Sequence, residues 1–234
     1  MHTLEQLRAG KLAGARHLKI ACGLETFPRE IFDLADTLEI LDLSGNALAA
    51  LPDDLPRLSR LRVLFCSESP FEALPEVLGA CPALEMIGFK GCRIRSVPEA
   101  SLPPTLRWLI LTDNRVEALP ASIGQCSGLQ KLALAGNRLT RLPPEMAACT
   151  RLELLRIAAN ALTELPDWLL YHPALDWWSP FQLVFTQEGK DATGASAGST
   201  SPPASMPRSA KTGTASSPAS RQRSAPALLP PNSA

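Results

Sequence analysis

The 234-residue chain lacks several features that would assign it to a functional class. Lys plus Arg and Asp plus Glu are equal at 23 each, so no excess charge favours a nucleic acid or an anionic membrane as partner. No apolar stretch approaches the roughly 20 residues of a membrane span, and the N-terminus has no apolar run of signal-peptide length. These absences predict a soluble cytoplasmic protein, with neither membrane nor nucleic acid as a partner.

Catalytic motifs are also missing. Gly10-Lys11 is followed by Leu12, which excludes a phosphate-binding GK[ST] sequence. No glycine-rich kinase loop, HRD or DFG triplet occurs. The sequence therefore predicts no catalytic residue, no metal and no cofactor. The histidines are expected to be isolated surface residues near the ends of the array: His2, His17 and His172.

Leucine, by contrast, recurs at a fixed period. "LDLSGNALAALP" at 41–52 returns as "LILTDNRVEALP" at 109–120 and "LALAGNRLTRLP" at 132–143. A period in the low twenties with the pattern LxxLxLxxNxLxxLP is typical of a leucine-rich repeat. This indicates an α/β solenoid of about seven to eight repeats over residues 1–180. The copies open 22 or 23 residues apart, at Leu38, Leu61, Leu84, Leu106, Leu129, Leu152 and Leu175.

Each repeat contains the pattern of one short strand. In Leu132-Ala133-Leu134 the two leucines face one way and the alanine the other, and successive copies should align these strands as a parallel sheet on a concave face. The Leu-Pro step that follows leaves room on the convex side only for extended, short helical or 3₁₀ segments. The acidic pair Asp53-Asp54 on that side is expected to be solvated. Thr3 to Gln6 forms a capping-box pattern for an N-terminal helix.

An asparagine follows the strand in four copies. Its amide can donate to, and accept from, backbone groups that the turn leaves unpaired inside the stack. Ser69 and Cys92 replace it in two copies, whose turns should be weaker. The asparagines are Asn46, Asn114, Asn137 and Asn160.

The six cysteines fit the repeat better than a metal or disulfide framework. No C-x-x-C pair occurs, and three cysteines precede a repeat-opening leucine by three residues. A free cysteine behaves as a small buried hydrophobe, so we expect structural thiols in a reducing compartment. They are Cys22, Cys66, Cys81, Cys92, Cys126 and Cys149.

The outward residues of the strands form the candidate binding surface. Most are large and apolar, although a sheet face exposed to water should be mostly polar. A contiguous apolar patch marks an interaction site, so a protein partner is predicted on the concave face; the alternative is that another segment covers it. The predicted contact residues are Ile40, Asp42, Val63, Phe65, Met86, Trp108, Ile110, Lys131, Leu154 and Arg156, of which Trp108 and Phe65 are the expected anchors. A basic rim is predicted at Lys90, Arg93, Arg115 and Arg138.

The repeat pattern ends near Trp177. An eighth copy begins at Leu175 but has Pro180 where a strand residue is required. Of the last 48 residues, 35 are Ser, Ala, Pro, Thr or Gly, which predicts a disordered tail over residues 187–234. The tail can be read as an inert extension, a linker, a secretion segment or a tract of phosphorylation sites. A further hypothesis is that the natural reading frame is lost near Trp177, because such composition is common in off-frame translation of GC-rich genes.

The amino-acid sequence of the repeats is more specific than the generic leucine-rich-repeat pattern. "LRWLILTDN", "LELLRIAAN" and the segment that opens "LEQLRAGKLAGARHLKI" resemble the N-terminal array of bacterial leucine-rich-repeat proteins that continue into a protein-kinase-like domain. The resemblance covers about residues 1–177 and implies an array that recognises a partner. Because the kinase motifs are absent, no catalytic role is carried onto this sequence.

Three functions follow from these observations. The first is a monomeric, non-catalytic protein-interaction module. The second is the sensing region of a serine/threonine kinase whose catalytic domain is missing or out of frame. The third is a secreted bacterial effector that binds a host protein.

Overall fold

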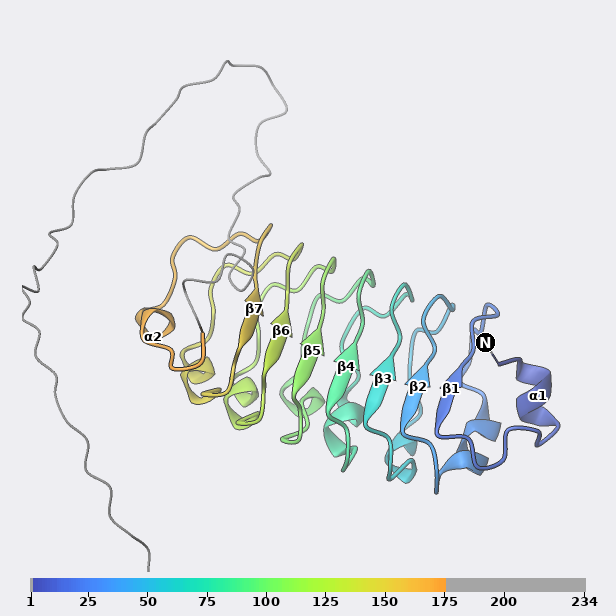
Figure 1. Ribbon diagram of the computed structural model, residues 1–234. Helices are drawn as coiled ribbons and strands as arrows, with labels where there is room; N and C mark the ends of the chain where they lie inside the picture. The colour runs from blue at the N-terminus through green and yellow to red at the C-terminus, as the bar shows by residue number, and fades with distance from the viewer. Residues whose placement is uncertain (1, 176–234) are drawn as a thin grey trace, which may run out of the picture. The chain divides into compact units, whose positions relative to one another are not determined.

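The computed structural model describes residues 2–175, which form a single parallel sheet of seven short strands in chain order (Figure 1). The tail at 187–234 and the failed eighth strand lie outside the described residues. The predicted solenoid is confirmed, with each strand beginning one residue earlier than the leucine alternation alone suggests. The strands are β1 His17–Lys19, β2 Ile40–Asp42, β3 Val63–Phe65, β4 Met86–Gly88, β5 Trp108–Ile110, β6 Lys131–Ala133 and β7 Leu154–Arg156.

The register aligns equivalent residues of successive repeats. Leu41 pairs with Leu64, Leu64 with Ile87, and Ile87 with Leu109, and all four side chains are fully buried. Because side chains alternate across a strand, the residues on either side of each buried one face outward. The outward face therefore carries two parallel rows of side chains, one from each end of the strands.

The return segments are short 3₁₀ helices, as the Leu-Pro spacing predicts. Successive ones stack on each other, as η3 does on η4 and η5 on η6. At the N-terminal end, the capping box of Thr3 and Gln6 is formed and α1 buries Leu7 against the core. The helices are α1 Leu4–Arg8, η1 Arg29–Leu34, η2 Leu55–Arg57, η3 Glu76–Ala80, η4 Glu99–Ser101, η5 Ala121–Gln125, η6 Pro144–Ala148 and α2 Asp167–Leu170.

The asparagines tie neighbouring turns together. Asn137 is 8% exposed; its amide donates to the carbonyls of Leu111 at 2.8 Å and Leu134 at 2.9 Å, and its Oδ1 accepts from the Val116 N–H at 2.9 Å. Asn46, Asn114 and Asn160 bridge in the same way, which confirms the predicted role.

The two substituted turns hold fewer bonds. The Ser69 hydroxyl reaches only Ser67 O in its own turn, at 3.4 Å, and the Cys92 thiol reaches Cys66 O at 3.3 Å. A hydroxyl or a thiol cannot supply two donors and an acceptor across the turn as an amide does. These turns therefore stay the expected weak points of the stack.

Asp54 is not a freely solvated carboxylate, which corrects the expectation for the acidic pair. Arg29 donates to its two oxygens at 2.7 and 2.6 Å, and Arg57 donates at 3.1 Å. Both guanidinium groups also lie over the Phe32 ring, 4.5 and 4.8 Å from its centroid. The hydrogen bonds from Arg29 lower the pKa of Asp54 to about 2, with a smaller contribution from Arg57. The cluster links η1 to η2.

We predict that Asp54→Asn lowers the melting temperature at pH 7, and that the difference from the unaltered protein disappears at low pH. The folded pKa of about 2 lies below the usual 3.8, so the ionised carboxylate stabilises the fold above about pH 4 and this contribution is lost as the pH falls through 2. Thermal scans between pH 2 and 7 measure it. Asp53→Asn is the control, since Asp53 makes no ion pair among residues 2–175. A difference at pH 2 as large as that at pH 7 would contradict the assignment.

Five of the six cysteines are buried, as predicted, but Cys22 is exposed. Burial raises the pKa of Cys126 to about 12 and those of Cys81 and Cys149 to about 11. Cys22 lies in the shortened first repeat, where its N–H donates to Asn46 Oδ1 and its side chain stays outside the stack. The prediction of a structural thiol is therefore wrong for Cys22.

Native alkylation should consequently modify a single thiol in the described part of the chain. At pH 7.5 iodoacetamide should add one carbamidomethyl group within minutes, at Cys22, and six after unfolding in urea, because a buried thiol forms little thiolate. Intact-mass spectrometry counts the additions, and Cys22→Ser should reduce the native count to zero. Rapid native labelling of Cys126 or Cys149 would show that the repeats open locally.

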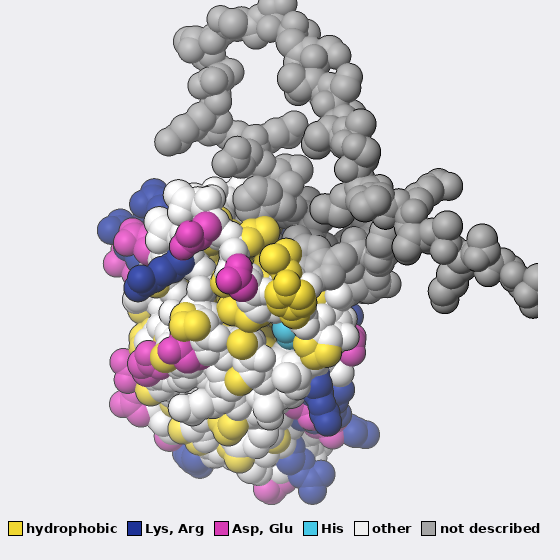
Figure 2. All heavy atoms as spheres, turned by 90° about the vertical axis from the view of Figure 1, so that its left-hand side faces the viewer, with side chains coloured by type: hydrophobic (Ala, Val, Ile, Leu, Met, Phe, Trp, Pro, Cys, Tyr) yellow, Lys and Arg dark blue, Asp and Glu magenta, His cyan; other side chains and the backbone are white. Residues whose placement is uncertain are grey.

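The C-terminal end of the described array differs from the expectation for one histidine. His172 is only 6% exposed, and its Nε2 lies 3.0 Å from the Cys149 carbonyl oxygen, so it packs inside the last turn rather than on the surface. Figure 2 views this end: hydrophobic side chains lie on the end face and charged ones gather around its margin. Leu170 and Tyr171 are 56% and 85% exposed there.

No helix within residues 2–175 is long and apolar enough to span a membrane.

Candidate functional site

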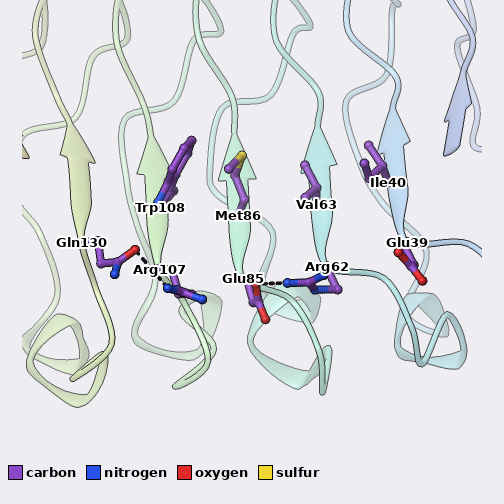
Figure 3. A pocket seen from close by; sticks show the side chains of 9 residues that line it. All are labelled: Glu39, Ile40, Arg62, Val63, Glu85, Met86, Arg107, Trp108 and Gln130. Atoms are coloured by element: carbon purple, nitrogen blue, oxygen red, sulfur yellow. Dashed lines mark hydrogen bonds and ion pairs between the residues drawn. The ribbon is translucent and has the colours of Figure 1, made fainter. Parts of the chain in front are cut away.

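The first outward row of the sheet lines a shallow hollow. The register places Ile40 beside Val63, Val63 beside Met86, and Met86 beside Trp108, and all four side chains are half-buried. Figure 3 shows the four side by side on β2 to β5. The hollow has a volume of about 340 Å³. The structure thus brings four of the predicted contact residues together on one surface.

The second outward row brings the Phe65 ring over Gly88. Phe65 pairs with Gly88, and a Cβ on Gly88 would lie 2.4 Å from the Phe65 ring. The absence of a side chain at Gly88 therefore lets the ring lie across β4. Asp42 precedes Phe65 in this row, and Ile110 follows Gly88.

At the N-terminal end of the second row, the charge of Asp42 is balanced by an ion pair with Lys19. Its Oδ2 lies 2.7 Å from Lys19 Nζ, and its Oδ1 accepts from the Ser44 N–H. Burial alone would raise the pKa of Asp42, but the hydrogen bonds from Lys19 and Ser44 outweigh it and the pKa lies below its usual value. The carboxylate is thus ionised and paired at neutral pH. Lys19 is not among the contact residues predicted from the sequence.

A row of side chains, all charged except Gln130, borders the hollow and was not predicted from the sequence. Its members precede each strand by one residue, and the first five alternate in sign along the sheet. Arg16 pairs with Glu39 at 2.6 Å and Arg62 with Glu85 at 2.8 Å. The row consists of Arg16, Glu39, Arg62, Glu85, Arg107, Gln130 and Glu153. The repeat period would have revealed it, because residues 22 or 23 apart are neighbours in the stack.

Lys131 interrupts the apolar row. Its Nζ lies 3.9 Å from the centroid of the Trp108 ring, a cation–π contact. Leu154 follows Lys131 in the register, so it is separated from Trp108 by this lysine, and Arg156 follows Ala133 in the second row. Apart from Asp42, which is paired with Lys19, the predicted contact residues therefore fall into an apolar group on β2 to β5 and a mixed group on β6 and β7.

The predicted basic rim lies in the turns that follow the strands. Lys90 is two residues beyond β4, where its Nζ lies 3.9 Å from Asp113 Oδ2. Arg93, Arg115 and Arg138 each follow the asparagine position and are exposed. They occupy a different row from Lys90 and from the hollow. No group of three or more potential metal ligands occurs among residues 2–175.

Comparison with known proteins identifies the repeats. A family profile described as Leucine rich repeat matches residues 104–162, and another of the same description matches 37–58. Human PH domain leucine-rich repeat-containing protein phosphatase 1 is 33% identical over 109 residues, 44% of this chain and 6% of that protein. TMV resistance protein N of Nicotiana glutinosa is 36% identical over 119 residues, which are 47% of this chain and 10% of that protein. Probable inactive serine/threonine-protein kinase roco10 of Dictyostelium discoideum is 30% identical over 125 residues, which are 48% of this chain and 4% of that protein.

Solved structures share the fold. The leucine-rich-repeat ectodomain of the Arabidopsis thaliana receptor kinase GASSHO1/SCHENGEN3, in complex with CASPARIAN STRIP INTEGRITY FACTOR 2, has a TM-score of 0.61 at 27% identity and covers 72% of this chain. The plant peptide hormone receptor RGFR1, in complex with RGF2, has a TM-score of 0.56 at 30% identity and covers 64% of this chain. The matches span 21% and 25% of those chains, so this chain corresponds to a fraction of each. The chain contains leucine-rich repeats stacked as a parallel β-solenoid, a fold that it shares with part of each of these two receptors.

Proposed function

We propose that the chain is a non-catalytic protein-interaction module that binds a segment of a partner protein on the outward, concave face of its sheet. The observation that carries the proposal is the continuous apolar row of Ile40, Val63, Met86 and Trp108 in one hollow. Two solved structures with this fold are receptors in complex with a factor or a hormone, which supports a role in binding.

The energetics of the face favour binding. Half-exposed apolar side chains in adjacent columns present a surface whose removal from water stabilises a complex. Trp108 is the expected anchor, because a large aromatic side chain in a hollow dominates interface energetics. Phe65, which lies over Gly88, extends the same surface toward the second row.

Quantitative affinity capture tests the proposal. The full chain and its Trp108→Ala variant would serve as baits in extract of cells that express the protein. The matched control is Tyr171→Ala, since Tyr171 is an exposed aromatic residue outside the sheet. A partner should be captured by the unaltered and control baits and lost with Trp108→Ala. With the purified partner, calorimetry should show an affinity loss of about 30-fold, which corresponds to about 2 kcal/mol. Equal affinity for all three baits would reject this face.

A second candidate function is the sensing region of a protein kinase. It is favoured by the likeness to kinase-associated arrays and by the roco10 and GASSHO1/SCHENGEN3 matches. An antibody against residues 1–170 tests it on a blot of the source cells. A band near 25.1 kDa supports the free module, whereas a band larger by a kinase domain supports the second candidate.

The proposal includes a monomer in the cytoplasm. Five buried free thiols support a reducing compartment, because such groups persist where disulfide formation is suppressed. Light scattering and cell fractionation test the two parts separately. The bacterial origin and the secreted effector stay predictions, since no observation of the fold favours them.

A further inference from the structure

The charges on the outward face are distributed unevenly. On its N-terminal half, cations are matched by carboxylates: Arg16 with Glu39, Lys19 with Asp42 and Arg62 with Glu85, at 2.6 to 2.8 Å. These pairs leave little net charge next to Ile40, Val63 and Met86. A partner that contacts this half therefore meets an apolar, locally neutral surface.

The C-terminal half carries cations without carboxylate partners. Arg107 donates only to the neutral Gln130 amide oxygen, at 3.3 Å. Lys131 and Arg156 make no ion pair among residues 2–175, and the nearby Glu153 makes none either. The three cations and one acid leave net positive charge on β5 to β7. A charge of this kind at the end of an apolar hollow favours an acidic group in the ligand.

Trp108 and Lys131 link the two halves. The ammonium group covers one face of the indole ring at 3.9 Å, so an apolar ligand group cannot use that face while Lys131 stays in place. A carboxylate between Arg107 and Lys131 would draw the ammonium toward itself. The ring would then become available to an apolar side chain. An acidic group would thus be recognised together with its apolar neighbour.

We propose that the bound segment is an extended peptide of the partner protein that carries an acidic side chain next to large apolar ones. The acid lies between Arg107 and Lys131, and the apolar side chains lie along Ile40, Val63 and Met86. This inference rests on the proposed function and specifies its ligand. The dimensions agree: β2 to β6 extend over about 19 Å at about 4.8 Å per strand, which an extended chain covers with about six residues.

Selection from a displayed library of random dodecapeptides tests the inference on the full chain. Sequencing should show enrichment of Asp or Glu beside large apolar residues. A labelled selected peptide and its Asp→Asn or Glu→Gln counterpart are then titrated by fluorescence anisotropy. The loss of the carboxylate should weaken binding to the unaltered chain about tenfold and make it less sensitive to salt.

Two double variants identify the residues that recognise the acidic side chain of the peptide. Arg107→Gln with Lys131→Gln should bind the acidic and amide peptides equally. Arg115→Gln with Arg138→Gln, which removes two exposed cations in the turns, should keep the tenfold preference. If it loses the preference, the acid lies at the turns and the inference is wrong.

The selection also separates this inference from the proposed function. If selected peptides lose affinity with Trp108→Ala but show no acidic preference, only the inference fails and the binding face stands. If no peptide depends on Trp108, both fail. Enrichment of Lys or Arg at the position beside the apolar residues would equally overturn the acidic assignment.

Discussion

Asn137→Ala will lower the free energy of unfolding by about 3 kcal/mol. The substitution removes three hydrogen bonds: the Val116 N–H is left without a partner, and the Leu111 and Leu134 carbonyls keep only their bonds from Asn114 and Asn160. At 8% exposure the site admits little solvent to replace the lost bonds. Each lost hydrogen bond costs about 1 kcal/mol. Urea denaturation followed by circular dichroism measures the change.

The neighbouring residue supplies the control. Arg138→Ala alters an exposed side chain in the same turn and should change stability by less than about 0.5 kcal/mol. Asn137→Asp retains an acceptor for Val116 but loses both donors, so it should be destabilising as well. Equal stability of Asn137→Ala and Arg138→Ala would show that the amide bridges contribute little to the stack.

Phe89→Ala should cost about 3–5 kcal/mol, the range found when a buried phenylalanine is truncated. Phe89 is fully buried and meets Phe71 edge to face, with ring centroids 5.0 Å apart. Its repeat has Cys92 at the asparagine position, and the Cys92 thiol donates to Cys66 O and Lys90 O without supplying the acceptor of an amide. Urea unfolding gives the magnitude, and the slope of the transition shows whether one repeat or the whole array unfolds.

Phe65→Ala is the matched comparison. Phe65 is also a phenylalanine of the central repeats, but it lies on the outward face over Gly88 and is half-buried. Its loss removes contacts from one side of the ring and should cost about 1 kcal/mol. Comparable losses for the two variants would mean that the outward face is part of the core, which would contradict its assignment as a free surface.

Most of the fold could be predicted because one physical rule repeats. Leu132 and Leu134 alternate with Ala133, and the same alternation recurs every 22 or 23 residues, so burial, strand and register follow together. The role of Asn137 followed from the unpaired groups that any such turn creates. The outward rows were predictable for the same reason, since a buried position fixes its two neighbours.

The missed features depend on long side chains that meet across repeats. Arg62 and Glu85 form a pair only because the stack places positions 23 residues apart side by side. The contact between Lys131 and Trp108 depends on a side-chain conformation that no period determines. Cys22 and His172 differ from prediction at the first and last turns, where the shortened repeat and α2 replace the regular pattern.

The register also has a consequence for how such a surface changes over generations. Each of the seven strands pairs with the one 22 or 23 residues away, and within residues 2–175 none pairs with a more distant segment. Recombination that duplicates one repeat would therefore insert one strand and one column of outward side chains while leaving every other pairing intact. Substitutions at outward positions such as Trp108 do not enter the core. The reach of the binding face and its chemistry can thus be altered separately, each by a single genetic event.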